Sequence, residues 1–206
     1  MNFLLSIFAG FLIGLGGTVN LIATGLTGAI FFSVGLYAIL MFKGHLVTGK
    51  FSTIGINGYH WYDYITCWLG NFVGATFAAL TCLMSSKYDV IYDGALRVSA
   101  IRFSNTFFEN VALGILCGIC VFIAVAGYSR NSHPLTVMLP VTVFVFCGFN
   151  HCVADMFYFI AANRMGDIHM YVALLATTLG NLLGCGIPAL IVSAGLSKGS
   201  KTKATF

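Results

Sequence analysis

Two short polar stretches decide the fold of this chain: KGHLVTGK at residues 43–50 and CGFNHCVAD at residues 147–155. Each interrupts a run of apolar residues, and each carries a glycine and a histidine. Polar groups at membrane depth are costly unless they are buried in protein or line a water-filled cavity. The two stretches therefore predict two broken membrane-spanning helices whose breaks face a polar interior.

The composition of the chain as a whole indicates a membrane protein. Of the 206 residues, 59% are apolar and 8% are charged, whereas a soluble domain carries about 25% charged residues. The mean hydropathy is +0.94. This composition excludes a disordered chain and an ordinary water-soluble enzyme, and no nucleic-acid partner is expected. A helix needs about 20 apolar residues to cross a bilayer, so the length suits roughly six crossings.

The apolar runs place these crossings. In chain order they cover about residues 1–22, 27–42, 62–84, 108–128, 134–146 and 168–195. Two shorter runs, 51–56 and 152–162, follow the polar stretches. We therefore expect an all-α integral membrane fold with six crossings, of which the second and fifth are broken. The first run lacks the positive start of a signal peptide, so it is expected to be retained.

The chain divides into two similar halves, about 3–84 and 108–195, followed by a basic tail at 196–206. The third crossing of each half carries Leu-Gly-Asn-x-x-Gly, at Leu69–Gly74 and Leu179–Gly184. Since three crossings reverse the direction of the chain, the halves form an inverted 3+3 repeat in a single transmembrane domain. Broken helices at matching places in such a repeat indicate a transport site, although the same motif is also typical of close helix packing.

The seven cysteines all fall within apolar segments, where we expect buried free thiols. Cys117 and Cys120 form a single Cys-x-x-Cys without a nearby histidine. We therefore expect no metal site and no cofactor.

The order of these motifs resembles the formate/nitrite transporter family over about residues 5–195. The segments that carry the resemblance are FAGFLIGLGG (8–17), GLYAILMFKGHLVTGKF (35–51), WLGNFVGA (68–75), NVALGILCGICVFIA (110–124), LPVTVFVFCGFNHCVADMFY (139–158) and TLGNLLGCG (178–186). The resemblance implies an aquaporin-like protomer in a homopentamer, with one pore per protomer. It also implies passage of small monovalent anions such as formate, nitrite or hydrosulfide, by a channel or a proton-coupled transporter.

The resemblance further implies a location in the lipid bilayer of a bacterial inner membrane, with both termini in the cytoplasm. A basic tail on the cytoplasmic side fits the positive-inside rule. Counted together, the basic residues of the tail and of the loops nevertheless divide evenly between the two sides, so charge alone does not set the orientation. The chain begins at the first crossing, so the amphipathic N-terminal helix usual in the family is not expected.

In the family pattern His151 is the residue at the centre of the pore. A histidine in an apolar surrounding can donate a hydrogen bond or a proton to a weak-acid anion. The neutral acid then crosses an apolar constriction at lower cost than the ion. Thr48 lies opposite His151 in this pattern, where its hydroxyl binds the histidine, the permeating anion or the backbone of the broken helix. Asn150, Lys50 and His45 are further expected pore residues, while a histidine that merely bridges two helices is the alternative.

The family's apolar gates match six residues that would otherwise be ordinary core packing. They are Leu36, Leu46 and Phe144 for the cytoplasmic gate, and Phe32, Val47 and Val121 for the other gate. Arg102 matches a basic residue of the outer vestibule, where it would concentrate anions. An ordinary loop arginine is the alternative for that position.

Several positions depart from the family pattern. His45 stands where the family usually has an acidic residue, and Lys43 and Lys50 flank it. Asp155 replaces a usual asparagine, and we expect it to pair with Lys50 or Lys43, unless both lysines extend to water. Gly118 also replaces a usual asparagine, which would remove a side-chain amide from beside the pore.

Two functions of other classes remain open. The repeat also fits an aquaporin-like pore for neutral solutes, but the chain lacks the paired Asn-Pro-Ala turns of such pores. A membrane enzyme would use His45, His151 and Asp155 as a metal or acid–base site. These residues lie in two separate breaks and not at i and i+4 of one helix, so an enzyme is not expected.

Overall fold

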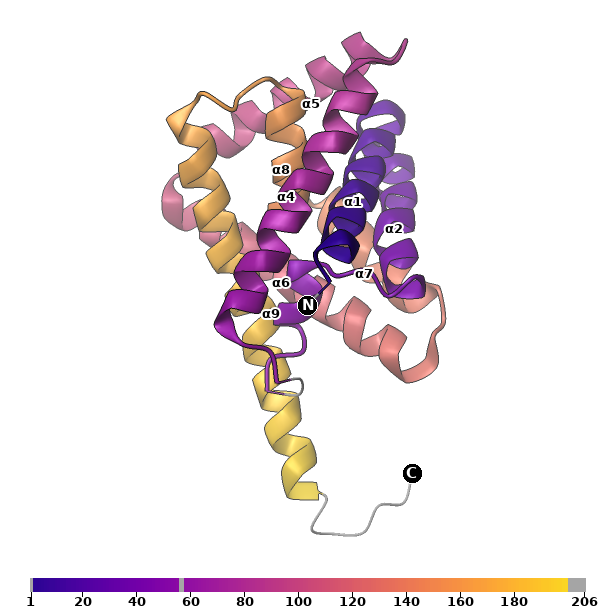
Figure 1. Cartoon of the computed structure of the whole chain (residues 1–206), viewed down its shortest axis with the longest axis vertical. Helices are drawn as coiled ribbons and strands as arrows, with labels where there is room; N and C mark the ends of the chain where they lie inside the picture. The colour runs from indigo at the N-terminus through magenta and orange to yellow at the C-terminus, as the bar shows by residue number, and fades with distance from the viewer. Residues whose placement is uncertain (1, 56–57, 200–206) are drawn as a thin grey trace.

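The structure is a computed structural model that describes residues 2–55 and 58–199, with side chains described as far as residue 195. Within these ranges it contains helices and no strands (Figure 1). The helices are α1 (Phe3–Ala23), α2 (Gly25–Met41), α3 (Val47–Phe51), α4 (Trp61–Leu83), α5 (Tyr88–Ser104), α6 (Phe107–Asn131), α7 (Leu135–Phe146), α8 (Cys152–Ala161) and α9 (Ile168–Gly199).

Four of the described helices, α1, α4, α6 and α9, are long and apolar enough to cross a membrane. Apart from α5, the shorter helices of the described residues form two pairs, α2 with α3 and α7 with α8, each pair separated by a non-helical joint. We call residues 42–46 the first joint and residues 147–151 the second joint. The second joint lies within the polar stretch 147–155, and the first joint lies within the stretch 43–50 except for Phe42.

Both joints are shorter than the polar stretches. The helix α3 begins at Val47, whereas the sequence predicted a helix from 51 to 56, and residue 56 lies outside the described residues. Thr48 and Lys50 therefore lie on a helix and not in a loop. The reason is tertiary, because a side chain from α4 accepts the first free backbone N–H of α3.

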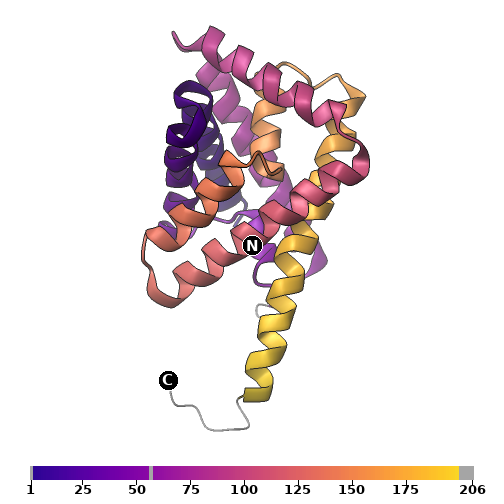
Figure 2. The same cartoon turned by 180° about the vertical axis from the view of Figure 1, so that it is seen from behind.

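The core of the molecule surrounds α8, whose ten residues are all buried. The helix α5 lies across the end of the bundle farthest from the C-terminus and packs against α8 (Figures 1 and 2). The sequence analysis placed no helix at α5, because its charged residues hide the apolar periodicity. Its buried residues nevertheless follow helical spacing: Ile91, Gly94, Ala95, Ser99 and Arg102.

Glycines let α1 pack closely on α4, and α6 on α9. A Cβ atom added at Gly74 would collide with the backbone of Ile7 and Phe11 in α1. One added at Gly184 would collide with the backbone of Ile115 in α6. The last glycine of each Leu-Gly-Asn-x-x-Gly motif is therefore a close-packing residue in the structure.

The cysteines partly depart from the expectation of full burial. All seven are free. Cys147 is exposed and Cys82 and Cys120 are partly exposed, while the other four are buried. Cys147 differs because it follows the last residue of α7, at the surface of the single chain. Among the described residues, no group of three or more histidine, cysteine or acidic side chains is arranged to hold a metal ion.

The close packing predicts that even a methyl group is not tolerated at either motif glycine. Gly74→Ala and Gly184→Ala should each lower the free energy of unfolding by about 1–3 kcal/mol, the usual cost of overpacking. Thermal unfolding in detergent, followed by size-exclusion chromatography, measures this. Gly166→Ala is the matched control, since a Cβ there has nothing within 4 Å. Equal stabilities of the three variants would contradict the packing described above.

Candidate functional site

One asparagine holds the first joint in place. The side-chain amide of Asn71, on α4, donates to the backbone carbonyls of Ser6 and His45, both at 2.8 Å. Its oxygen accepts the backbone N–H of Val47, the first residue of α3, at 2.9 Å. The bonds to His45 and Val47 satisfy backbone groups that the break leaves without helical partners, and the bond to Ser6 ties the joint to α1.

A second asparagine holds the second joint in the same way. The side-chain amide of Asn181, on α9, donates to the carbonyls of Gly114 and Asn150 at 2.9 and 2.8 Å. Its oxygen accepts the backbone N–H of Cys152, the first residue of α8, at 2.8 Å. The two joints thus use one pattern of contacts, in which Asn150 takes the place of His45 and Cys152 that of Val47.

This correspondence places His151 at the position that Leu46 holds in the first joint. His151 is the N-cap of α8, and its Nδ1 accepts the backbone N–H of Ala154 at 3.2 Å. Its Nε2 lies 3.1 Å from the hydroxyl oxygen of Thr48. Because Nδ1 acts as an acceptor, the proton of the neutral ring is on Nε2, which donates toward Thr48.

The pair is buried where the two joints approach each other. Thr48 is fully buried and His151 is 2% exposed. The imidazole stacks on the ring of Phe144, with centroids 5.8 Å apart and planes inclined by 17°. Phe144 also contacts Phe32 edge-on at a centroid distance of 5.8 Å. A hydroxyl and an imidazole therefore meet beside the apolar rings of Phe144 and Phe32.

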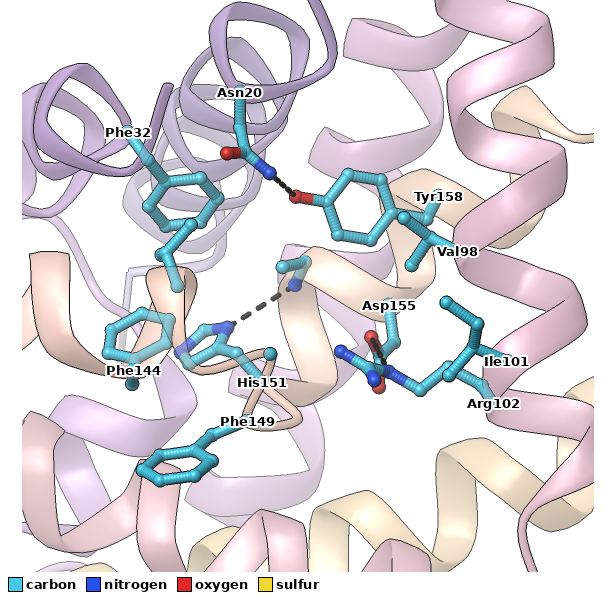
Figure 3. A pocket seen from close by; sticks show the side chains of 13 residues that line it. Asn20, Phe32, Val98, Ile101, Arg102, Phe144, Phe149, His151, Asp155 and Tyr158 are labelled. Carbon is cyan, nitrogen blue, oxygen red and sulfur yellow. Dashed lines mark hydrogen bonds and ion pairs between the residues drawn. The ribbon is translucent and has the colours of Figure 1, made fainter. Parts of the chain in front are cut away.

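A cavity of about 140 Å³ opens from His151 toward α5, and we call it the Arg102 cavity. Figure 3 shows Arg102 and Asp155 on one side of it and Phe32 and Phe144 on the other. The Arg102 Nε lies 3.4 Å from the Asp155 carboxylate, which also accepts the Thr177 hydroxyl at 3.2 Å.

The pairing of Asp155 corrects the sequence-based expectation of a partner at Lys43 or Lys50. Asp155 lies in the first turn of α8, and it faces Arg102 on α5. No helix was expected around Arg102, so the contact between Arg102 and Asp155 was not predicted. Arg102 and Asp155 are both buried, and each neutralises the other.

A chain of amides joins the Arg102 region to the second joint. Asn110 donates to the Arg102 carbonyl at 2.9 Å, and Asn150 donates to the side-chain oxygen of Asn110 at 2.8 Å. Asn150 is fully buried, and its own side-chain oxygen has no partner among the described residues. The expected pore residue Asn150 therefore positions the joint with its amide nitrogen and leaves one acceptor unused.

A second cavity, of about 270 Å³, lies on the other side of the first joint, and we call it the Lys50 cavity. Leu36 and Leu46 line it together with Lys43, His45 and Lys50. The first joint lies close to the start of α1, because the His45 N–H donates to the Leu5 carbonyl.

The residues of the predicted cytoplasmic gate do not all line the same cavity. Leu36 and Leu46 line the Lys50 cavity, but Phe144 lines the Arg102 cavity with Phe32. The reason is that α2 packs on α7, which brings Phe32 against Phe144. The remaining gate candidates, Val47 and Val121, are fully buried and are not among the lining residues of either cavity.

A sequence profile described as formate/nitrite transporter matches residues 1–194. The chain belongs to the formate/nitrite transporter family. The formate channel FocA of Haemophilus influenzae is 30% identical over 154 residues, which cover 65% of this chain and 52% of FocA. FocA of Escherichia coli K12 is 30% identical over 156 residues, which cover 68% of this chain and 55% of FocA. The chain thus spans about half the length of these curated relatives.

Solved structures show the same fold. A pentameric formate channel with formate bound superposes with a TM-score of 0.80 at 23% identity, covering 95% of this chain and 96% of that chain. A channel described as an FNT family ion channel gives 0.79 at 21% identity, with coverages of 98% and 90%. The all-helical fold of this family member is therefore that of formate/nitrite transporter channels, and the matched relatives are named as channels, not enzymes.

Gly118, which replaces a usual asparagine of the family, has a packing role in this chain. A Cβ atom at Gly118 would lie 2.8 Å from the Asn181 carbonyl oxygen and 2.9 Å from the Cys185 backbone nitrogen. Gly118 therefore faces α9, and a side-chain amide there would displace backbone. The glycine permits close packing of α6 on α9, so its presence does not open space beside the Thr48–His151 pair.

The positioning role of Asn71 and Asn181 was not predicted, because the sequence shows them only as one residue of a repeated motif. The signal that could have found them is the recurrence of one polar residue at the same motif position in both halves. Glycine recurrence has a packing explanation, but a buried amide requires several hydrogen-bond partners.

The matched contacts of Asn71 and Asn181 predict that removal of either amide lowers the stability of the protein to a similar extent. Asn71→Leu and Asn181→Leu each remove a hydrogen bond to a carbonyl and one to an N–H of a joint, together with the bond to a carbonyl of a neighbouring long helix. Each variant should lower the free energy of unfolding by about 2 kcal/mol or more. Thermal unfolding in detergent measures the change. Asn131→Leu serves as control because Asn131 is exposed at the end of α6, and it should change stability much less. A variant as stable as the control would show that its joint does not depend on the amide.

Proposed function

We propose that this chain forms a transmembrane channel or proton-coupled transporter for small monovalent weak-acid anions such as formate, nitrite or hydrosulfide. The observation that carries the proposal is the buried Thr48–His151 pair, which lies at the meeting of two helix breaks with a cavity on either side. Membership of the formate/nitrite transporter family and the FocA relatives, which are named formate channels, support it.

The proposed architecture is a single transmembrane domain of six crossings in an inverted 3+3 repeat. The four long helices supply four crossings, and the pairs α2–α3 and α7–α8 supply the two broken ones. The matched hydrogen bonds of Asn71 and Asn181 support the repeat. We place the protein in a bacterial inner membrane with both termini in the cytoplasm.

We further propose a homopentamer in the lipid bilayer, with one pore in each protomer. The similar solved structure described as a pentameric formate channel supports this assembly. Large apolar side chains exposed on the single chain fit a surface covered by lipid or by neighbouring protomers; examples are Trp61, Phe77, Phe108, Leu139 and Ile191.

The proposed path runs from the Lys50 cavity past Thr48 and His151 to the Arg102 cavity. Leu36 and Leu46 restrict it on one side, and Phe32 and Phe144 restrict it on the other. A bare anion loses its hydration at such apolar surfaces, and this loss is the costly step. A group that neutralises or hydrogen-bonds the anion between the two restrictions therefore lowers the barrier.

His151 suits this role because its Nε2–H is held ready as a donor. A hydrogen bond to an anion is stronger than one to a neutral hydroxyl, so an anion can replace Thr48 as the acceptor. The Thr48 hydroxyl then has its own proton free for the same anion. A second proton on the imidazole would displace the Ala154 N–H from Nδ1, so hydrogen-bond donation is the direct role and any proton given to the anion must be replaced from solvent.

The proposal predicts that His151 contributes to the pH dependence of transport. Flux of formate should rise as the pH falls, because more of the permeating acid is protonated and any proton that the histidine gives to the anion is replaced more readily. His151→Asn keeps an N–H donor but does not titrate, so its pH profile should be flatter. Formate flux into proteoliposomes over a series of pH values measures this. His133→Asn, at an exposed histidine before α7, is the control, and an unchanged profile in His151→Asn would remove the protonation role.

A pore for neutral solutes is the second candidate, and one observation favours it. The Arg102 cavity carries no net charge from its ion pair, since Asp155 neutralises Arg102. Such a cavity admits a neutral solute as readily as an anion.

Swelling of proteoliposomes separates the two candidates. Vesicles containing the protein should swell in a gradient of formate and should stay close to protein-free vesicles in a gradient of glycerol. Light scattering follows both. Swelling in glycerol at a rate equal to that in formate would favour the neutral-solute pore.

A further inference from the structure

The two cavities differ in electrostatics, although each contains cationic side chains. In the Arg102 cavity the guanidinium is paired with Asp155, whose other oxygen is held by Thr177. Attraction between this guanidinium and a passing anion is offset by repulsion from the carboxylate. The cation that the family pattern assigns to anion attraction is therefore largely neutralised in this chain.

The Lys50 cavity has the opposite character. Lys43, His45 and Lys50 line it, and no aspartate or glutamate belongs to its lining within the described ranges. On α4, which packs on α3, the carboxylate of Asp63 accepts the backbone N–H of His60. Two lysines and one histidine thus line one cavity whose described lining contains no acidic side chain.

Lys50 is the central cation of this cavity. It is 5% exposed, and its ammonium lies 4.0 Å from the centre of the Tyr59 ring. No ion pair joins Lys50 to a carboxylate of the residues that the structure describes. A buried ammonium without a counter-charge is unfavourable, and a cation–π contact offsets only part of that cost.

His45 supplies a second unsatisfied group. Its backbone is fixed, because its N–H donates to Leu5 and its carbonyl accepts the Asn71 amide. Its ring nitrogen Nδ1 is buried and has no hydrogen-bond partner in the described part of the chain. An imidazole nitrogen without a partner and a buried ammonium therefore belong to one cavity, and both donate to a small carboxylate when the proton of the imidazole is on Nδ1.

We propose that the Lys50 cavity is an anion-capture site for small carboxylates, in which Lys50 is the main cation and His45 and Lys43 assist. Anions load from this side, on which α1 begins, at lower concentration than from the Arg102 side. This inference rests on the proposed anion transport, because it assigns the entry site of the same pathway. Asp155 is the residue that reduces capture on the opposite side.

Removal of the Lys50 charge tests the site. Formate uptake is measured in proteoliposomes sorted by the accessibility of a C-terminal tag, with formate supplied to one side at a time. Lys50→Gln should raise the half-saturation concentration roughly fivefold or more when formate is on the side of the Lys50 cavity, and much less when it is on the Arg102 side. Lys50→Arg keeps the charge and should stay near the wild type. Lys87→Gln is the matched control, since Lys87 is exposed beside α5.

Asp155→Asn tests the other half of the proposal without altering the Lys50 cavity. It should lower the half-saturation concentration on the Arg102 side, because Arg102 then attracts anions without the opposing carboxylate. This variant also keeps the proposal testable if Lys50→Gln does not fold.

Calorimetric titration of the purified protein with sodium formate measures capture independently of transport. Lys50→Gln should weaken formate binding by a factor similar to the change in half-saturation concentration. Equal affinity in the wild type and Lys50→Gln, or equal half-saturation from both sides in the wild type, would overturn the inference while formate transport stands. A wild-type protein that conducts no formate would overturn the proposed function, and calorimetry would then decide the binding site by itself.

Discussion

A helix that breaks inside a membrane must find partners for the backbone groups that it frees, and the rest of this structure depends on how that requirement is met. Asn71 and Asn181 meet it with the same three hydrogen bonds in the two halves of the chain. Each amide ties a joint to a long helix on either side. These contacts, together with the backbone hydrogen bonds of His45 to Leu5 and of Asn150 to Leu113, set the positions of Thr48 and His151.

The packing glycines and the polar site are consequences of the same arrangement. Gly74 and Gly184 follow the two asparagines in their motifs and bring α1 onto α4 and α6 onto α9. Only at that short distance do the asparagine amides reach the carbonyls of Ser6 and Gly114. The close helices then carry α3 and α8 toward each other, so that a hydroxyl from one meets an imidazole from the other. Charge is distributed around this centre unequally, with a compensated pair on one side and uncompensated lysine and histidine on the other.

Much of this was predictable because polar residues are conspicuous in an apolar chain. The positions of both joints, the family and the proximity of Thr48 to His151 follow from the sequence and its resemblance. The helix α5 was missed because charged residues mask its apolar face, although Ile91, Ala95 and Arg102 lie at helical spacing. The prediction that Phe144 lies on the same side as Leu36 and Leu46 was wrong, because the position of Phe144 depends on how α2 packs on α7.

The sequence by itself determined that this chain is an all-helical membrane protein with two polar breaks, because hydration costs forbid polar backbone in lipid and leave few other folds. The tertiary structure alone decided the partners of the charged residues. Asp155 meets Arg102 and not Lys50, since α8 and α5 are adjacent in space although distant in the chain. Electrostatic interactions act across space and carry no signature of sequence spacing, and for that reason the charge of each cavity emerged only from the folded molecule.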